Sequence, residues 1–395
     1  MDGRVVYICV LSILIAGAAG FVAQALTRLI GLVTNLSFYG TISTVFTSPA
    51  ANRLGPLVVL VPIAGAVVVG LMARYGSAAI RGHGIPEAME QVLLNKSRIP
   101  ARITLLKPVS AAISIGTGGP FGAEGPIIAT GGAVGSLVGQ LLHTTAVERK
   151  TLLAAGAAAG MTATFGSPVS AVLLAVELLL FELRPRSLIP VALAAAAATA
   201  VRIGFVGITP AFAMPNIAQP GEGALAAYVL LGALVGVAAV AVTKVVYAIE
   251  DAFDHLPIHW MWWPAIGAVA VGVCGYFSPH TLGVGYDNIE RILSGDFGGQ
   301  ALLVLGVLKF VSWSISLGRD ARDRAEPELV AAGLNGDPDT KGRPVAGSGP
   351  RESQGESLQC LRTFCACNPF GPLMMSNSTR SPSLSERKPS IWMAV

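Results

Sequence analysis

The chain is 395 residues long; 53% of these residues are hydrophobic and only 13% are charged. This balance and a mean hydropathy of +0.64 indicate a polytopic membrane protein and exclude an ordinary soluble domain. No set of metal ligands, nucleophile with a neighbouring base, or phosphate-binding loop is apparent, so we expect neither an enzyme nor a cofactor. The net charge of +4 gives no reason to expect nucleic acid as a partner.

Helices that cross a bilayer need about 20 mostly apolar residues each. Candidate segments are Val5 to Ala25, Leu54 to Met72, Ala111 to Leu141, Thr151 to Val176, Leu188 to Val201, Ala224 to Thr243, Met261 to Phe277 and Ala301 to Leu317. The first continues as apolar sequence to Ile30, which favours an anchor over a cleaved signal peptide. Basic residues between Arg74 and Lys107 predict a cytoplasmic connection. We therefore expect an all-α, multi-pass protein of the plasma or inner membrane, surrounded by lipid.

Glycine and proline interrupt this apolar pattern at three places. The first break is Gly82-His83-Gly84-Ile85-Pro86, the second runs from Gly119 to Pro126, and the third is Phe165-Gly166-Ser167-Pro168. Unpaired backbone is costly in lipid, so such breaks survive only inside protein or beside a wet cavity. We expect three half-helices to begin close together near the bilayer midplane, as in the anion sites of many transporters.

The second break places one carboxylate, Glu124, where a helix should begin. The glycines on either side let backbone amides approach a ligand, and Pro126 suits the first helical turn. A helix N-terminus favours negative charge, so a diffusing anion and the Glu124 carboxylate compete for the same position. The sequence therefore predicts a gate at Glu124. The alternative is an acid that only satisfies the amides of the helix start.

These breaks resemble, in order and spacing, the motifs of the CLC family of voltage-gated chloride channels and chloride/proton antiporters. Gly82 to Pro86 is similar to the family's Gly-Ser-Gly-Ile-Pro motif, and Gly122 to Pro126 is similar to its Gly-Arg-Glu-Gly-Pro motif. Phe165 to Glu177 resembles the next helix start, Phe-Asn-Ala-Pro followed by a glutamate. The resemblance extends from Val5 to Gly318.

The resemblance implies a CLC-type inverted-repeat fold and a homodimer with a separate pore in each subunit. Chloride is then the transported ion and Glu124 the gating residue. The anion-binding residues that it implies are Gly82, His83, Gly84, Ile85, Gly122, Ala123 and Gly125. Residues 1–205 are expected to form the first half, residues 206–318 an incomplete second half, and residues 319–395 a disordered tail.

The chain departs from the family pattern at three positions. His83 stands where the family often has serine; its imidazole can still donate to an anion, or it is only a turn residue. Ala123 replaces an arginine, which removes a positive charge. Leu178 directly follows Glu177 and stands where exchangers carry a second, proton-relaying glutamate. For Glu177 itself we expect a structural role. This favours a passive channel unless Glu182 takes over the relay.

The composition changes abruptly after Gly318, where 19 of the 50 charged residues lie. We interpret this tail as a disordered extension that arose from a shift of reading frame, and we assign no role to its cysteines, Cys360, Cys365 and Cys367. The hypothesis from sequence is thus a CLC-family chloride channel gated by Glu124. The alternatives are a chloride/proton antiporter and a nonconducting truncated fragment.

Overall fold

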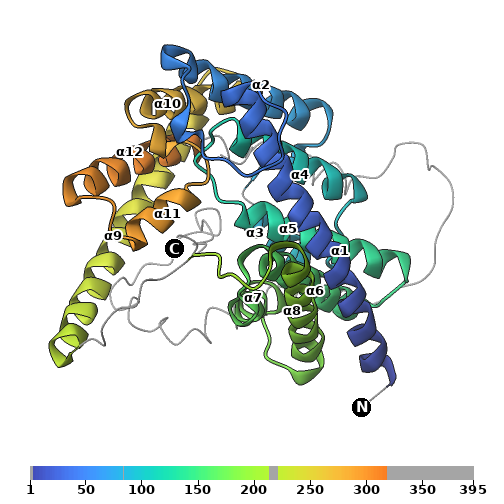
Figure 1. The fold of residues 1–395 in the computed structure, drawn as a ribbon. Helices are drawn as coiled ribbons and strands as arrows, with labels where there is room; N and C mark the ends of the chain where they lie inside the picture. Colours follow the sequence, from blue (N-terminus) through green and yellow to red (C-terminus); the bar gives the residue numbers. More distant parts are fainter. Residues whose placement is uncertain (1–2, 83, 213–220, 318–395) are drawn as a thin grey trace, which may run out of the picture. The chain divides into compact units, whose positions relative to one another are not determined.

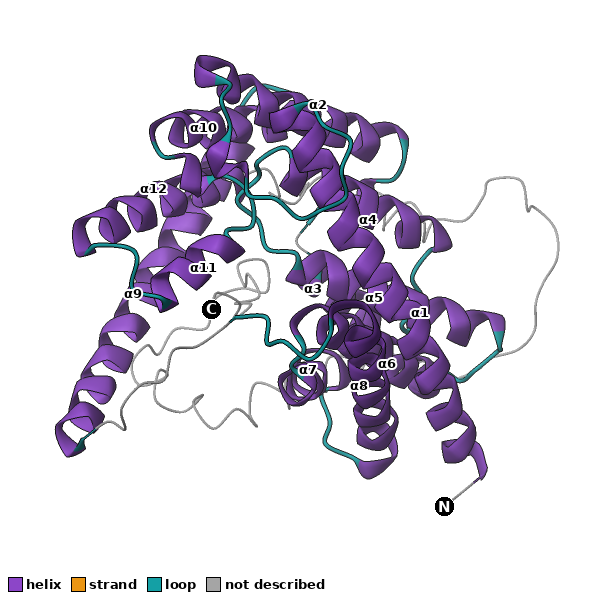
Figure 2. Cartoon of the chain, in the orientation of Figure 1, coloured by secondary structure: helices purple, strands orange, loops and turns teal. Residues whose placement is uncertain are grey.

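The computed structural model describes residues 3–82, 84–212 and 221–317 (Figure 1). All regular structure within these ranges is helical (Figure 2), which confirms the predicted all-α class. The α-helices are α1 (Gly3–Thr34), α2 (Leu60–Tyr75), α3 (Ile85–Leu94), α4 (Ala101–Gly116), α5 (Glu124–Leu141), α6 (Ala146–Phe165), α7 (Pro168–Ala175), α8 (Pro185–Val206), α9 (Glu222–Asp254), α10 (Trp263–Phe277), α11 (Tyr286–Leu293) and α12 (Gly299–Leu317). The predictions about His83 and about residues 319–395 fall outside the described residues.

Six helical stretches in the described ranges are long and apolar enough to cross a bilayer. They are Gly3–Tyr39, Gly55–Tyr75, Pro185–Val206, Gly223–Phe253, Trp260–Phe277 and Gly299–Leu317. Each overlaps a segment predicted from the sequence. The first extends well beyond the predicted end at Ala25, because a π-helical turn (Asn35–Tyr39) prolongs α1 until Gly40, whose φ of +64° ends it.

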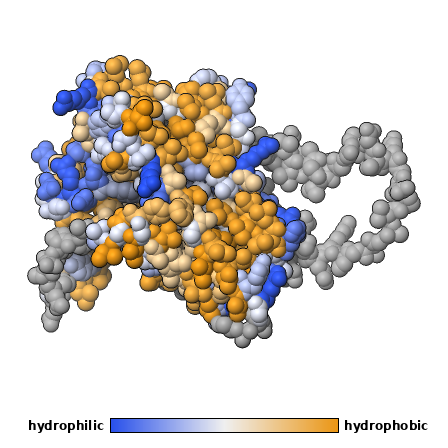
Figure 3. All heavy atoms as spheres, turned by 45° about the vertical axis from the view of Figure 1, so that its right-hand side comes forward, coloured by the Kyte–Doolittle hydropathy of each residue, from blue (hydrophilic) through white to orange (hydrophobic). Residues whose placement is uncertain are grey.

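The face of the molecule shown in Figure 3 is largely apolar. Large hydrophobic side chains along the long helices are exposed, among them Leu14 of α1 (66%), Leu60 of α2 (59%) and Leu230 of α9 (63%). Lipid is as apolar as these side chains, so this surface suits a bilayer and not water.

Two of the predicted segments are pairs of shorter helices. The segment Ala111 to Leu141 contains the end of α4 and all of α5, and Thr151 to Val176 contains most of α6 and all of α7. Gly166 ends α6 with a φ of +71°, a conformation that glycine adopts readily, and Pro168 starts α7. The second and third predicted breaks therefore separate helices in the fold.

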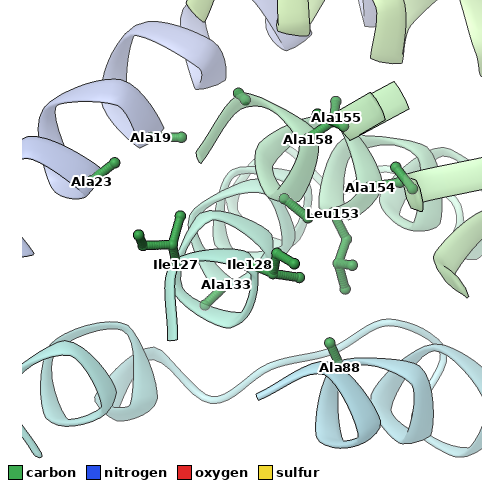
Figure 4. Packing of buried hydrophobic residues seen from close by; sticks show 14 of the residues in the cluster. Ala19, Ala23, Ala88, Ile127, Ile128, Ala133, Leu153, Ala154, Ala155 and Ala158 are labelled. Carbon is green, nitrogen blue, oxygen red and sulfur yellow. The ribbon is translucent and has the colours of Figure 1, made fainter. Parts of the chain in front are cut away.

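The largest hydrophobic core surrounds α5 and α6, and Figure 4 shows the small side chains that α1 and α3 contribute to it. The α5 and α6 backbones approach closely. A Cβ added to Gly135 would lie 2.0 Å from the Leu152 carbonyl oxygen, and one added to Gly156 would lie 2.2 Å from that of Gly131. Only glycine fits at such a crossing. This contact fixes α5 and hence the place where Glu124 begins it.

The same order of elements occurs twice along the chain. A 3-10 turn (Ala78–Ile80), α3 and α4 follow α2, and a 3-10 turn (Pro279–Thr281), α11 and α12 follow α10. The two leading helices, α2 and α10, pack against each other. A Gly-x-Gly pattern precedes both short helices, and its glycines, Gly82 and Gly84 in one copy and Gly283 and Gly285 in the other, all have positive φ. The fold therefore presents two similar helix starts.

Candidate functional site

The first and second predicted breaks are in direct contact. A Cβ built on Gly84 would lie 2.3 Å from the Gly125 carbonyl oxygen and 3.2 Å from the Ala129 Cβ. Gly84 also has a φ of +102°, so a side chain here is both obstructed and strained. The start of α3 thus packs on the first turn of α5, and these two half-helices begin together as predicted.

A glutamate in the first turn of α3 holds this helix start. The Gly84 N–H donates to Glu87 Oε2 over 2.6 Å, so an anion has to compete with Glu87 for that amide. The same carboxylate covers Gly82, where an added Cβ would meet Glu87 Oε1. Ile85, the first residue of α3, is partly buried against the main core. His83, which stands between Gly82 and Gly84, lies outside the described residues.

A buried lysine of α4 fixes the loop that leads into α3. Lys107 is 4% exposed. Its Nζ donates to the carbonyl oxygens of Ile80 (2.9 Å), Arg81 (3.3 Å) and Gly82 (2.6 Å). A buried ammonium needs acceptors for its three protons, and this loop provides them. From the sequence, Lys107 was only a topology marker, so its positive charge beside Gly82 was not predicted.

Glu124 begins α5, as predicted, and the preceding Ala123 is buried. The Glu124 side chain folds back over Gly122, where an added Cβ would clash with Glu124 Oε2. The side chain is partly buried. A carboxylate here lies at the end of α5 that favours negative charge. The position therefore suits an anion or an acidic side chain that takes its place.

Tyr286, the first residue of α11, lies beside this carboxylate. Burial and the negative charge of Glu124 raise the pKa of Tyr286, whose hydroxyl also neighbours the Ala123 backbone. The tyrosine ring stacks on Phe46 at 5.9 Å between centroids and meets Phe165 edge-on at 6.1 Å. Phe165 belongs to the third break. Tyr286 therefore joins the second break to the third.

No role for Tyr286 was predicted from the sequence. The signal that could have found it is the second Gly-x-Gly pattern, which directly precedes it as the first pattern precedes Ile85. The repeat extends to a lysine, because Lys309 Nζ of α12 donates to the carbonyls of Thr281 (3.3 Å) and Gly283 (3.0 Å). Lys309 thus anchors the loop before Tyr286 as Lys107 anchors the loop before Ile85.

The third break carries a buried arginine on its flank. Arg202 of α8 is 6% exposed, and a Cβ added to Gly166 would lie 3.0 Å from its Nε. The guanidinium therefore lies at the C-terminal end of α6, where the last carbonyl groups favour positive charge. Arg202 is a second positive charge near the breaks that the sequence analysis missed.

The acids beyond the third break differ in their surroundings. Glu177 lies in a π-helical turn (Val176–Leu180) that continues α7, and Leu178 packs against the main core. Glu182, the predicted substitute for a relay glutamate, accepts from Ser187 Oγ at 2.8 Å and pairs with Arg184 at 3.3 Å. The Glu182 carboxylate is thus engaged at the start of α8.

Long apolar helices combined with short helices that start inside the protein define an integral, multi-pass membrane protein. Residues 64–322 match the sequence model of the voltage gated chloride channel family, Voltage_CLC. This match covers more than half of the chain, so the chain belongs to that family, and the resemblance seen in the motifs is confirmed.

Curated relatives are 27% to 29% identical to this chain over the aligned residues. A putative chloride channel protein ClcB-like of Ralstonia nicotianae is 27% identical over 286 residues, which cover 71% of this chain and 66% of the relative. The chloride channel protein CLC-e of Arabidopsis thaliana is 29% identical over 60% of this chain and 34% of its own length. An H(+)/Cl(-) exchange transporter ClcA of Vibrio campbellii is 29% identical over 67% and 58%. The chain thus spans about one to two thirds of these relatives.

Solved structures share the fold. A slow cyanobacterial Cl-/H+ antiporter superposes with a TM-score of 0.69 at 20% identity, over 80% of this chain and 74% of that one. A CLC-type fluoride/proton antiporter superposes with a TM-score of 0.65 at 19% identity, over 80% and 77%. These similarities confirm the predicted CLC-type helical fold.

Proposed function

We propose that the chain forms a pathway for anions across the membrane, with Glu124 as a displaceable plug at the start of α5. One observation carries this proposal: the Glu124 carboxylate folds back over Gly122, next to the place where Gly84 packs on Gly125. A carboxylate and a halide carry the same charge and are attracted by the same amides, so they exclude each other. Protonation or displacement of the side chain then admits the ion.

Chloride is the proposed ion, since the family and the matched relatives carry it in their names. The glycine backbone of Gly82, Gly84, Gly122 and Gly125, with Ile85 and Ala123, forms the proposed anion-binding site, and His83 belongs to it by its place between two glycines of the first break. The positive charges of Lys107 and Arg202 support anion entry although Ala123 lacks the family's arginine. A homodimer with one pore in each subunit is proposed from the family.

Passive conduction is the proposed mode of transport. Its support is that Leu178 cannot carry a proton and that Glu182 is engaged by Ser187 and Arg184. Coupled exchange of chloride and protons is the second candidate, because matched relatives and solved neighbours are named as exchangers. The two modes differ in whether chloride movement drives protons.

Purified full-length chain in chloride-loaded liposomes tests both. Chloride efflux and external pH are recorded together, with a potassium ionophore to dissipate the membrane potential. The proposal expects chloride efflux with no proton movement against its own gradient. Proton uptake driven by an imposed chloride gradient would establish exchange instead. A protein that remains a folded dimer but releases no anion would overturn the transport proposal and favour a nonconducting fragment.

A further inference from the structure

A buried arginine without a partner lies where α6 ends and α7 begins. Arg202 belongs to α8, which packs against both of these helices (Figure 1). Its surface is only 6% exposed. Within the described ranges its guanidinium forms neither an ion pair nor a hydrogen bond, and its Nε is fully buried. Burying an unpaired charge is costly, so such a group calls for an opposite charge beside it.

The position of the guanidinium is defined by Gly166. A Cβ built on this glycine would lie 3.0 Å from Arg202 Nε and 3.3 Å from Cζ. Gly166 ends α6, and Ser167 and Pro168 follow it directly at the start of α7. Gly166 and Ser167 are exposed. The arginine head group therefore lies just beneath the surface of the third break.

The end of α6 does not supply the missing partner. The Ala163 carbonyl accepts from Gln24 Nε2 at 3.2 Å, and the Thr162 carbonyl accepts from the Gly166 N–H at 2.8 Å. Arg202 donates to neither. The hydroxyl of Thr162, one turn before Gly166, is itself buried and unpaired. The helix end attracts the arginine through its partial negative charge, but no hydrogen bond satisfies the guanidinium.

The start of α7 adds further donors to the same place. The N–H groups of Val169 and Ser170 lie in its first turn and have no acceptor within the helix. The Ser167 side chain, at the N-cap, does not cap them. A helix N-terminus favours negative charge. Unpaired amides and an unpaired guanidinium thus occur on either side of Gly166, and all of them are donors.

A second arginine raises the positive potential at this end of α8. Arg28 of α1 is exposed, and its guanidinium lies over the Phe205 ring, 5.7 Å from the centroid and about one turn beyond Arg202. Neither arginine forms an ion pair within the described residues. The local charge is therefore positive and uncompensated by the protein, which favours an anion from solution.

We propose that a small monovalent anion, such as chloride, binds between the Arg202 guanidinium and the first turn of α7 and neutralises the arginine. This site is separate from the start of α5. It goes beyond the proposed function, in which Arg202 only supports anion entry, and the ion is bound whether or not the chain conducts. Since the guanidinium is almost fully buried beside Gly166, a small ion reaches it more readily than a bulky lipid headgroup.

The test is thermal melting of the full-length protein in a neutral detergent without added lipid. Chloride replaces gluconate stepwise at constant ionic strength. Binding to the folded state should raise the melting temperature by about 2–4 °C for each tenfold increase in chloride above the dissociation constant. Arg202→Met should lose this rise, apart from any that binding at the α5 start contributes. Arg186→Met, at an exposed position of the same helix, is the matched control and should keep the full rise.

The behaviour without chloride separates an ion site from a merely structural arginine. Arg202→Met removes an uncompensated buried charge, so in gluconate it should melt no lower than the unmodified protein, and only in high chloride should it melt lower. The two curves should therefore cross. An Arg202→Met protein that melts lower by the same amount at every chloride concentration would overturn the proposal, because its response to the ion is then unchanged.

A second variant decides if Arg202→Met does not fold. Arg202→Lys keeps the charge but loses the planar fork, so it should still respond to chloride, with an affinity about tenfold weaker. An Arg202→Lys protein with the chloride midpoint of the unmodified protein would count against the guanidinium as a ligand.

The place of the ion can be observed directly. Crystals grown in bromide should show an anomalous peak within hydrogen-bonding distance of the Arg202 guanidinium. Crystals without a peak there, or a protein stabilised by anionic lipid but not by chloride, would refute the small-ion site. None of these measurements requires transport. A protein that passes no anion fails the proposed function, while the melting curves and the bromide peak still decide on this site.

Discussion

Gly84 and Gly125 meet backbone to backbone, and a Cβ on Gly84 would lie 2.3 Å from the Gly125 carbonyl oxygen. This contact brings the starts of α3 and α5 together, which is the geometric basis of the proposed anion site.

Gly84→Ala should therefore reduce anion efflux from liposomes at least about tenfold, because the added methyl group drives α3 away from α5. Gly295→Ala is the matched control, since Gly295 also has a positive φ, of +80°, but nothing lies within 4 Å of its added Cβ. Both changes introduce backbone strain of about 1–2 kcal/mol. Equal efflux from the two variants would show that the close contact is irrelevant to transport.

Lys107→Met should lower both the thermal stability in detergent and the anion efflux. The change leaves the carbonyl groups of Ile80, Arg81 and Gly82 without their donor, at about 1–3 kcal/mol for each buried group that stays unpaired. Lys244→Met makes the same substitution at an exposed site on α9 and should alter neither property. A Lys107→Met protein with the melting temperature and efflux of the unmodified protein would contradict the anchoring role.

The crossing of α5 and α6 should tolerate no side chain at Gly135. Gly135→Ala puts a methyl group 2.0 Å from the Leu152 carbonyl oxygen and is expected to destabilise the fold by about 1–3 kcal/mol. Gly236→Ala on α9, with nothing within 4 Å, is expected to be neutral or to stabilise its helix by up to about 1 kcal/mol. Melting curves in the same detergent compare the two, and a Gly135→Ala protein as stable as Gly236→Ala would refute the close crossing.

The start of α6 should make stability depend on pH in the acid range. Arg4 donates to both Glu148 oxygens, at 2.5 and 2.9 Å, and with Thr145 it lowers the pKa of Glu148 from 4.5 to about 2. A lowered folded-state pKa stabilises the protein above about pH 4.5, and this contribution is lost as the pH falls towards 2. Glu148→Gln should therefore melt at a lower temperature than the unmodified protein at pH 7.

That difference in melting temperature should shrink steadily between about pH 4.5 and 2. Glu290→Gln, a change of the same kind at an exposed site on α11, provides the comparison for a general effect of charge removal. A Glu148→Gln difference that stays constant down to pH 2 would argue against the ion pair as its cause.

Much of the fold could be predicted because its signals are local. Apolar length marks the spanning helices, and glycine followed by proline marks where helices stop and restart, so the starts of α3, α5 and α7 were all expected. The first segment was predicted to end at Ala25, but α1 runs to Thr34 and its π-helical turn to Tyr39, because the apolar pattern fades after Ile30 while packing on other helices keeps the backbone helical.

The parts of the site that were not predicted from the sequence depend on contacts between distant segments. Lys107 served only as a topology marker and Lys309 had no predicted role, since a sequence does not show that carbonyl groups about 26 residues away will surround each ammonium group. Tyr286 is 162 positions from Glu124 and comes close to it only through the packing of α11. Motifs mark helix starts, but the side chains that complete the site come from the tertiary fold.

The most direct test of the central claim is the pH dependence of anion efflux from liposomes that carry the full-length protein or Glu124→Gln. Glu290→Gln, an exposed acid on α11, serves as the matched control. If Glu124 plugs the site, its neutral variant should pass anions faster at neutral pH and respond little to acid, while Glu290→Gln behaves like the unmodified protein. Unchanged efflux and an unchanged acid response in Glu124→Gln would contradict the claim.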